Sequence, residues 1–484
     1  MEGAIKPSDV CGGPVPQDER PEGLRPSDLL QLVDNDALVL SGHSLGVIPL
    51  SVFTLTTLQR LDLSKNKLKT VPDAISTLQA LTDLNLGSNE LVTLPASIGS
   101  MRSLIYLNLM SNSLTALPDE IGNLGALYRL GLKGNKLTAL PHTIGGLTSL
   151  VELFITDNLI HSLPAEFGRC TSLVKMQASF NRLSALPVEL ANLQRLELLR
   201  VAVNCLSEVP SQMAACSGLA WMSLAGNPAC PPPPLRGRIA DVTIEQLSLG
   251  APLGEGASGD VFAAHMEGEE VAVKVFKGEV SPDGKAADEI SVTCYVNHPH
   301  LTRVLAVLQQ PHALVLRRVA GQPLAAKPNL QSLLRCRWPP GAAFSSTFVA
   351  RVALCVASAL QYLHTHCICH GDVYAHNILV DTEGNATLLD YGASFFYKPG
   401  TLPYEAQEVR AFGLFLSDML ARVEGTDKAS SVRAGLEDIA AGALHKDPLS
   451  RPSFEAIAAH CSRLTKGKGV TADSASSLQA LHGK

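Results

Sequence analysis

Leucine recurs along the first half of the chain at a fixed spacing and alternates with polar residues. One complete copy of the pattern reads Leu58-x-x-Leu61-x-Leu63-x-x-Asn66-x-Leu68. Asparagines stand at positions 66, 89, 112, 135, 158, 181, 204 and 227, and prolines at 49, 72, 95, 118, 141, 164, 187 and 210, each 23 residues apart. The Leu-x-Leu alternation predicts one short strand per copy, with its leucines on the buried face. Because one copy cannot close a core alone, the copies are expected to stack.

This period and its asparagine resemble the leucine-rich repeat. The resemblance implies an α/β leucine-rich repeat solenoid of about nine 23-residue repeats over residues 37–228. Each asparagine is expected to bond backbone groups where the chain turns off its strand. Residues 1–36 are rich in Pro, Gly, Asp and Glu, and we interpret them as a flexible N-terminal arm and cap with a short helix around 27–33.

The outward positions of these strands form the surface on which the repeats are expected to bind a protein partner. Extended concave faces are the usual binding sites of solenoids. Aromatic and methionine side chains on such a face fit protein binding better than exposure to solvent alone. The predicted partner-binding residues are Tyr106, Met110, Phe154, Phe180 and Trp221.

A proline run marks the end of the repeats. The segment Pro228-Ala-Cys-Pro-Pro-Pro-Pro234 predicts a stiff, extended spacer. We therefore divide the rest of the chain into a proline-rich linker at 229–240, a second folded domain at 241–465 and a polar tail at 466–484.

A glycine-rich segment opens the second domain. Residues 253–262 carry the pattern Gly-x-Gly-x-x-Gly-x-Val, and the strand 271–274 that follows ends in a lysine. Glycines let backbone amides close over phosphates with no side chain in the way. The predicted ATP-binding residues are Leu253, Gly254, Gly256, Gly259, Val261 and Lys274.

Acid and amide side chains follow at the spacing that phosphoryl transfer requires. Asp372 and Asn377 stand five positions apart, and Asp390 stands thirteen positions further on. The chemistry needs a carboxylate to orient the attacking hydroxyl, and oxygen ligands to hold Mg²⁺ on the phosphates. Asp372 suits the first role, whereas Asn377 and Asp390 suit the second. Apolar runs at 378–380 and 387–389 predict short buried strands that fix the ends of this loop.

Together these motifs resemble the glycine-rich loop, catalytic loop and metal-binding turn of the protein kinase superfamily. The resemblance implies a bilobal α+β domain that uses ATP and Mg²⁺. Its catalytic residues would be Asp372, Lys274 on the phosphates, and Glu289 as the carboxylate that pairs with Lys274. Asp288 is the neighbouring alternative to Glu289, but a shift of one helical residue turns a side chain by about 100°.

Several positions depart from the family pattern or occupy it in an unusual way. Gly371 replaces the arginine that reads a phosphate on the activation loop, so switching by loop phosphorylation is not expected. Tyr374 replaces the lysine that contacts the γ-phosphate in serine/threonine kinases. His376 lies where tyrosine kinases carry a compensating arginine, and we hypothesise that it fills that role in part. Glu408 stands in place of an aspartate at the start of the central helix, and Arg451 is expected to close a structural ion pair.

The segment after the metal-binding turn is short. Only 15 residues separate Gly392 from Glu408, where protein kinases fit a peptide platform closed by Ala-Pro-Glu. The usual peptide-binding surface is therefore in doubt. The repeats could recruit a substrate instead, by raising its effective concentration near the site.

Composition and charge indicate which partners and which cellular compartment to expect. A net charge of −6 and a pI near 6.2 provide no basic field for nucleic acid. Eleven cysteines without framework spacing favour reduced thiols, and the N-terminus lacks the apolar core of a signal peptide. No run approaches the ~18 apolar residues of a membrane helix, so we expect a cytoplasmic protein without a membrane span. The histidines and cysteines of 364–370 suggest metal ligands by composition, but no second ligand pair follows at zinc-site spacing.

The leading hypothesis is an ATP-dependent protein kinase, serine/threonine before tyrosine, whose repeats recruit a protein partner or substrate. One alternative is a pseudokinase scaffold that binds ATP and proteins without transferring phosphate. Another is a small-molecule phosphotransferase, since a His-Gly-Asp loop followed by a short segment also occurs in aminoglycoside- and choline-kinase-like enzymes.

Overall fold

The computed structural model describes residues 32–231, 239–256, 258–281, 283–329, 331–400, 403–427 and 430–466. These residues form two compact units, divided between Val151 and Glu152. The polar tail after 466 and most of the predicted linker lie outside the described residues. The helix expected around 27–33 also lies largely outside them, and Val33 begins a strand.

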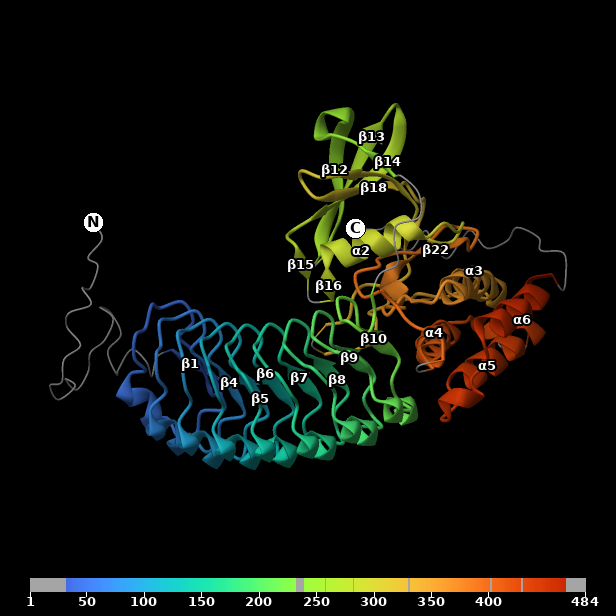
Figure 1. The fold of residues 1–484 in the computed structure, drawn as a ribbon. Coiled ribbons are helices and arrows are strands. Elements are labelled where there is room, and N and C mark those ends of the chain that lie inside the picture. Colours follow the sequence, from blue (N-terminus) through green and yellow to red (C-terminus); the bar gives the residue numbers. More distant parts are fainter. Residues whose placement is uncertain are drawn as a thin grey trace. The chain divides into compact units, whose positions relative to one another are not determined.

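The first unit is a ladder of short strands with a 3-10 helix after each repeat (Figure 1). The first two strands pair antiparallel and the following ones pair parallel in chain order. Its strands are β1 (Val33–Asp34), β2 (Ala37–Val39), β3 (Arg60–Asp62), β4 (Asp83–Asn85), β5 (Tyr106–Asn108) and β6 (Arg129–Gly131). Its 3-10 helices are η2 (Leu50–Thr54), η3 (Asp73–Thr77), η4 (Ala96–Ser100), η5 (Asp119–Asn123) and η6 (His142–Gly146).

The repeat asparagines hold successive turns together, as predicted. The amide nitrogen of Asn66 donates to the carbonyl of Leu40 at 2.8 Å and to that of Leu63 at 2.9 Å. Its amide oxygen accepts from the backbone N–H of Leu45 at 2.9 Å. One buried side chain thereby satisfies backbone groups of two repeats, which an apolar residue could not do. The central leucine of each strand, such as Leu61, is buried in the stack.

The second unit begins with four more strands of the same kind. They are β7 (Glu152–Phe154), β8 (Lys175–Gln177), β9 (Leu198–Arg200) and β10 (Trp221–Ser223), which pair parallel in this order. The 3-10 helices η7 (Ala165–Arg169), η8 (Val188–Asn192) and η9 (Ser211–Ala215) accompany them. Contacts therefore join these last repeats to the domain that follows, although the period in the sequence predicts a domain boundary only near residue 228.

A six-stranded sheet and one helix form the small lobe of the second unit (Figure 1). The strand order is β11-β17-β18-β14-β13-β12, and a core that includes Val271, Val273 and Val315 lies on one face. The elements are β11 (Ala240–Asp241), η10 (Ile244–Gln246), β12 (Leu247–Glu255), β13 (Gly259–Met266), β14 (Glu269–Phe276), the hairpin β15 (Val280–Ser281) and β16 (Gly284–Lys285), α2 (Ala286–Tyr295), β17 (Val304–Leu308) and β18 (Ala313–Arg317).

The large lobe is mainly helical. Its helices are α3 (Ser346–Thr365), α4 (Tyr404–Leu420), α5 (Ser431–Ala443) and α6 (Phe454–Lys466), with the 3-10 turns η11 (Ala375–Asn377), η12 (Gly425–Asp427) and η13 (Pro448–Ser450). Its short strands are β19 (Gln322–Pro323), β20 (Ile368–Cys369), β21 (Ile378–Val380), β22 (Ala386–Leu388) and β23 (Phe395–Phe396). The pairing of β21 with β22 confirms the two strands predicted around the catalytic loop.

Helix α3 is long and apolar enough to cross a membrane by length and composition, which the count of consecutive apolar residues did not indicate. Most of it is buried, and it packs against α6, α4 and α5 in Figure 1. Ser345 caps its start by accepting the backbone N–H of Phe348 at 3.2 Å. This environment is typical of the core helix of a folded lobe.

Candidate nucleotide-binding and phosphotransfer site

A cavity of about 350 Å³ lies between the two lobes of the second unit. This volume falls within the usual range for small-molecule sites. The lining includes residues of the glycine-rich strands β12 and β13, Lys274 from β14, Glu289 from α2, and Asn377 and Asp390 from the large lobe. All six predicted ATP-binding residues lie in it: Leu253, Gly254, Gly256, Gly259, Val261 and Lys274.

Lys274 is the centre of the charge arrangement in this cavity. Its ammonium group forms an ion pair with Glu289 and lies 3.2 Å from Asp390 Oδ1. The predicted choice of Glu289 over Asp288 agrees with this contact. Burial disfavours the charge of Lys274, but the carboxylates of Asp390 and Glu289 outweigh burial and raise its pKa. The lysine therefore remains a cation where a phosphate would lie.

The two carboxylates beside Lys274 are affected differently. Burial raises the pKa of Glu289 to about 7 despite its contact with Lys274. For Asp390, burial also favours the neutral form, but the Lys274 cation outweighs it and lowers the pKa to about 2. Asp390 is therefore ionised near neutral pH, as a ligand of a divalent cation must be. It occupies the left-handed region with φ 64°, in the turn predicted to bind metal.

The catalytic loop holds Asp372 and Asn377 together. The side-chain amide of Asn377 donates to Asp372 Oδ2 at 2.7 Å and to the Asp372 carbonyl at 3.0 Å. The backbone N–H of Leu389 donates to the Asn377 carbonyl at 2.8 Å, which fixes the loop against the strand before Asp390. His370 is buried and contacts the Leu389 carbonyl through Nε2 at 3.0 Å. The loop therefore presents one carboxylate beside a potential metal ligand.

The residues present fit ATP and Mg²⁺. Asn377 and Asp390 line the same cavity and offer the oxygen donors that Mg²⁺ prefers. Lys274 would neutralise charge on the phosphates, and Mg²⁺ would draw charge from the transferred phosphoryl group. The side chain of Asp372 is 18% exposed and lies outside the lining of this cavity.

The segment after the metal-binding turn folds without a peptide platform among its described residues, 393–400 and 403–407. Strand β23 pairs with β20, and α4 then begins at Tyr404. Glu408 on α4 accepts the backbone N–H of Gly371 at 2.8 Å and contacts His364 Nε2 at 2.7 Å. Its role is therefore to position the catalytic loop.

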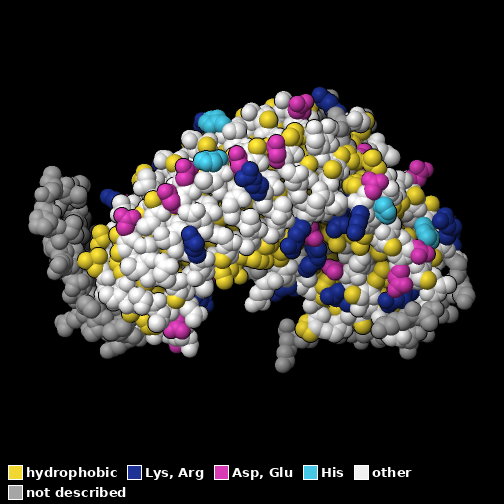
Figure 2. Space-filling view, turned by 90° about the horizontal axis from the view of Figure 1, so that it is seen from below, with side chains coloured by type: hydrophobic (Ala, Val, Ile, Leu, Met, Phe, Trp, Pro, Cys, Tyr) yellow, Lys and Arg dark blue, Asp and Glu magenta, His cyan; other side chains and the backbone are white. Residues whose placement is uncertain are grey.

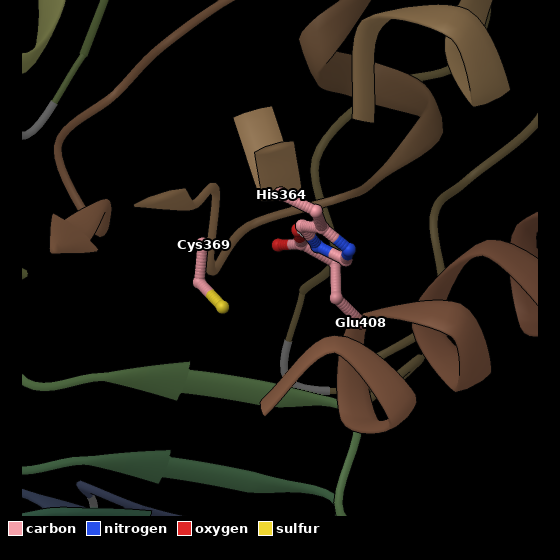
Figure 3. Close-up of side chains that lie close together, drawn as sticks. All are labelled: His364, Cys369 and Glu408. Carbon is pink, nitrogen blue, oxygen red and sulfur yellow. The ribbon is translucent and has the colours of Figure 1, made fainter. Parts of the chain in front are cut away.

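Figure 3 shows His364 and Glu408 lying against one another, with Cys369 to one side. One potential ligand atom from each of the three residues lies within 4.8 Å of the others. Both oxygens of Glu408 are already engaged by protein groups, and burial raises the pKa of the Cys369 thiol well above its usual value. Because a thiol must lose its proton to bind zinc, this cluster supports the structural interpretation of 364–370.

Arg451 does not close the predicted ion pair. Its guanidinium donates instead to three carbonyls, of His445 at 3.0 Å, Ala406 at 2.8 Å and Ser217 at 2.7 Å. Among the described residues no carboxylate pairs with it within 4 Å. The expectation that Arg451 is structural is kept, but its partners are carbonyls of the large lobe and of the last repeat turn.

The two unusual residues after Asp372 turn away from the phosphate side. Tyr374 is buried and stacks on Trp221, with ring centroids 4.4 Å apart and planes 6° apart. The Nδ1 atom of His376 lies 3.3 Å from the thiol of Cys336. Burial lowers the pKa of His376, so it is neutral near pH 7 and does not supply the cation that we hypothesised.

The predicted partner-binding residues divide into two groups. Tyr106 is 38% exposed, and Met110, Phe154 and Phe180 are partly exposed, as an interaction surface requires. Trp221 is only 2% exposed, and its indole N–H donates to the Val373 carbonyl at 3.0 Å. The prediction that Trp221 binds a separate partner is therefore wrong, because the catalytic loop of the same chain covers it.

Arg200 is a site residue that its sequence position did not reveal. It is 3% exposed, its guanidinium pairs with Asp372, and it donates to the Gly371 carbonyl at 2.9 Å. The repeat register places it on the outward strand face, and nothing in the repeat pattern indicates that the catalytic loop covers this face. Gly371, in place of the arginine of the family pattern, is the one sequence feature connected with this contact, because a side chain there would meet the Met222 carbonyl at 2.5 Å.

Figure 2 shows acidic and basic side chains on the face it presents, with several lysines and arginines close together near its middle. The full sequence carries a modest net charge of −6.

A two-lobed fold with a nucleotide-sized cavity, a lysine–glutamate pair and an Asp-Asn-Asp set is the arrangement expected of a site for phosphoryl transfer from a nucleotide. Comparison with family models agrees. Residues 247–413 match the protein kinase domain, 97–219 match a leucine-rich repeat region and 36–91 match a leucine-rich repeat. The chain therefore consists of leucine-rich repeats followed by a protein kinase domain.

Several curated relatives are named as kinases. The rat megakaryocyte-associated tyrosine-protein kinase is 36% identical over 152 residues, which cover 31% of this chain and 30% of the relative. A probable serine/threonine-protein kinase of Dictyostelium discoideum is 32% identical over 145 residues, covering 29% of this chain and 9% of the relative. A probable kinase of Encephalitozoon cuniculi, a KIN1 homolog, is 27% identical over 188 residues, covering 35% and 31%. The chain thus matches less than a third of the length of each relative.

Proposed function

We propose that the protein is an ATP- and Mg²⁺-dependent protein kinase whose leucine-rich repeats recruit a protein partner or substrate. The observation that carries the proposal is the contact of Lys274 with both Glu289 and Asp390 in a cavity that the glycine-rich strands also line. A scaffold that only binds proteins has no chemical need for this set. The side-chain amide of Asn377 also holds the Asp372 carboxylate, the group that would orient an acceptor hydroxyl.

The acceptor is proposed to be serine or threonine before tyrosine. The relatives include a tyrosine kinase and a probable serine/threonine kinase, so they support a protein acceptor but do not distinguish between the two kinds of acceptor residue. Our reason is His376, which stands where tyrosine kinases carry an arginine and which is neutral and turned to Cys336. Phosphoamino-acid analysis of labelled product tests this choice, and phosphotyrosine as the main product would refute it.

Partner recruitment is proposed for the outward strand positions of the first unit. Tyr106 is exposed there, with the Arg129 guanidinium 5.4 Å from its ring centroid. Aromatic and arginine side chains are enriched where proteins bind one another. Met110 lies close by, against Gly131 on the next strand. A protein partner and a cytoplasmic location belong to the same proposal.

A labelled-phosphate assay in cell lysate tests both parts. Lysate is incubated with Mg-[γ-³²P]ATP and either the wild-type chain, Asp372→Ala or Tyr106→Ala/Met110→Ala. We expect bands that require Asp372, some of which also weaken when the repeat face is changed. Equal labelling by wild type and Asp372→Ala would refute catalysis and favour the pseudokinase scaffold.

A small-molecule acceptor is the second candidate. The observation that favours it is the absence of a peptide platform among the described residues between Gly392 and Glu408. Labelled aminoglycoside or choline, with no labelled protein in the same lysate, would support this candidate. Labelled protein that depends on Asp372 would exclude it.

A further inference from the structure

Arg200 connects the repeats to both lobes of the kinase domain within the second unit. Its guanidinium pairs with Asp372 and donates to the Gly371 carbonyl at 2.9 Å, and its Nε lies 3.1 Å from Asp283 Oδ1. Asp283 lies in the hairpin before α2, whereas Asp372 lies in the catalytic loop. The distance between Arg200 Nε and Asp283 makes them an ion pair, but Nε does not form a hydrogen bond. Burial opposes the charge of Arg200, yet Asp283 and Asp372 outweigh it and raise its pKa.

The backbone beside Arg200 lies close to both lobes. The hydroxyl of Ser223 on β10 donates to the Asp283 carbonyl at 2.7 Å. Gly371 has φ 75°, and a Cβ placed on it would lie 2.5 Å from the Met222 carbonyl. An arginine, which the kinase pattern places at this position, would have to displace β10. The glycine thus permits the last repeat to lie directly on the catalytic loop.

Further contacts extend this interface across the large lobe. Arg335 forms a two-pronged ion pair with Glu197, at 2.8 and 3.0 Å. Arg410 on α4 donates to the Gly218 carbonyl at 2.9 Å. Trp221 stacks on Tyr374. Tyr374 stands where the family resemblance expects a lysine, and the cation that pairs with Asp372 is Arg200 of the repeats.

The catalytic groups are assembled while the repeats are in place. Lys274 contacts Glu289 and Asp390, and Asn377 contacts Asp372, in the same structure that contains the Arg200 contacts. A domain that switched the enzyme off by displacing α2 would be expected to separate Lys274 from Glu289. The observed pair is formed.

We propose that Arg200 is a positioning residue of the kinase reaction, supplied by the repeats of the same chain. It holds the Asp372 carboxylate in place and ties the hairpin before α2 to the catalytic loop, so that the kinase domain depends on its own repeats. This inference rests on the proposed phosphotransfer function. Arg200 itself does not line the nucleotide cavity, so its removal should affect turnover and leave nucleotide binding unchanged.

The test compares full-length wild type, Arg200→Met, Arg200→Lys and Arg195→Met. Arg195 is an exposed arginine five positions earlier and is the matched control. Transfer from Mg-[γ-³²P]ATP to casein and to the chain itself gives kcat and KM, and a fluorescent ATP analogue gives the dissociation constant. We expect kcat to fall about 10- to 100-fold in Arg200→Met, since small misplacements of catalytic groups cost this much. Binding of the analogue should change less than about twofold, and Arg200→Lys should recover part of the rate.

The outcomes separate the two proposals. Transfer by Arg200→Met at the wild-type rate would overturn the inference and leave the last repeats with a structural role only. Faster transfer than wild type would also overturn it and show that the last repeats inhibit the kinase domain. If wild type incorporates no more labelled phosphate than Asp372→Asn does, the proposed function is refuted, and this inference with it. If Arg200→Met does not fold, Asp283→Asn decides, because it removes only the charge that faces Arg200 from the small lobe and leaves the Arg200–Asp372 pair in place. A rate equal to wild type in that variant would overturn the connection to α2.

Discussion

The ammonium nitrogen of Lys274 lies 3.2 Å from Oδ1 of Asp390, although 116 positions separate the two residues. The contact joins β14 of the small lobe to the turn after β22 of the large lobe. Both residues line one cavity with the glycine-rich strands. A single triphosphate can therefore reach the lysine and the proposed metal ligand together.

Replacing Lys274 tests this arrangement. Lys274→Met removes the cation from between buried Glu289 and partly exposed Asp390, so we expect transfer to fall roughly 100-fold or more. A matched change is Lys285→Met, on the exposed side of the same lobe, which should transfer at the wild-type rate. Filter-binding measurement of labelled casein provides the rates, and comparable rates for the two variants would contradict the assignment.

Gly371 gives a prediction about stability. Alanine at this position would adopt a positive φ and meet the carbonyls of Met222 and Ala393 at 2.5 and 2.6 Å. Gly268 also has a positive φ, of 87°, but has open space around its Cβ position. We expect Gly268→Ala to cost about 1 kcal/mol of unfolding free energy and Gly371→Ala distinctly more. Equal midpoints in thermal unfolding would show that β10 does not press on the catalytic loop.

Trp221 is expected to contribute strongly to the same interface. Trp221→Ala removes a buried ring, its stack on Tyr374 and a hydrogen bond, and should lower unfolding free energy by about 3 kcal/mol. The control is Tyr106→Ala, where the ring is 38% exposed and the cost should stay under about 1 kcal/mol. Urea unfolding followed by circular dichroism measures both. Similar losses in the two variants would contradict the burial of Trp221.

Much of this architecture follows from the sequence because its signals are local and periodic. The 23-residue spacing gives the strands and the asparagine ladder, and the motif spacing places Lys274, Asn377 and Asp390 in one cavity. The docking of the last repeats could not be predicted in the same way. It depends on which face of β9 and β10 another domain covers, and Arg200 and Trp221 look like ordinary outward positions in the repeat.

The errors have the same origin. Arg451 stands in a segment that resembles the kinase pattern, but the groups that the described residues bring within its reach are carbonyls of His445, Ala406 and Ser217. His376 has the position of a compensating cation, yet burial keeps it neutral. In both cases the position along the chain was informative, while the role depended on groups that only the folded structure brings near.

His298 gives the stability of the kinase domain a dependence on pH. Burial, followed by the neighbouring His300, lowers the pKa of His298 from 6.5 to about 4. Below pH 6.5 the unfolded chain therefore binds a proton that the folded chain does not, so stability falls as pH decreases toward 4. Because the ring is partly exposed, the loss between pH 7.5 and 5 should be on the order of 1 kcal/mol.

The measurement is thermal unfolding of wild type and His298→Gln at pH 7.5 and pH 5. Glutamine does not titrate in this range and can still bond Ser358, whose hydroxyl lies 3.3 Å from His298 Nε2. The variant should therefore lose less stability than wild type on acidification. An equal decrease in both proteins would assign the acid sensitivity to other groups.

Transfer of labelled phosphate by the purified chain, wild type beside Asp372→Asn, tests the central claim most directly. The substitution removes the carboxylate that orients the hydroxyl and leaves the cavity lining unchanged. We predict that Asp372→Asn binds Mg-ATP as wild type does and that its rate of phosphate transfer falls roughly 100-fold or more. Equal incorporation by the two proteins, or incorporation by neither while both bind Mg-ATP, would contradict the account of this chain as a protein kinase.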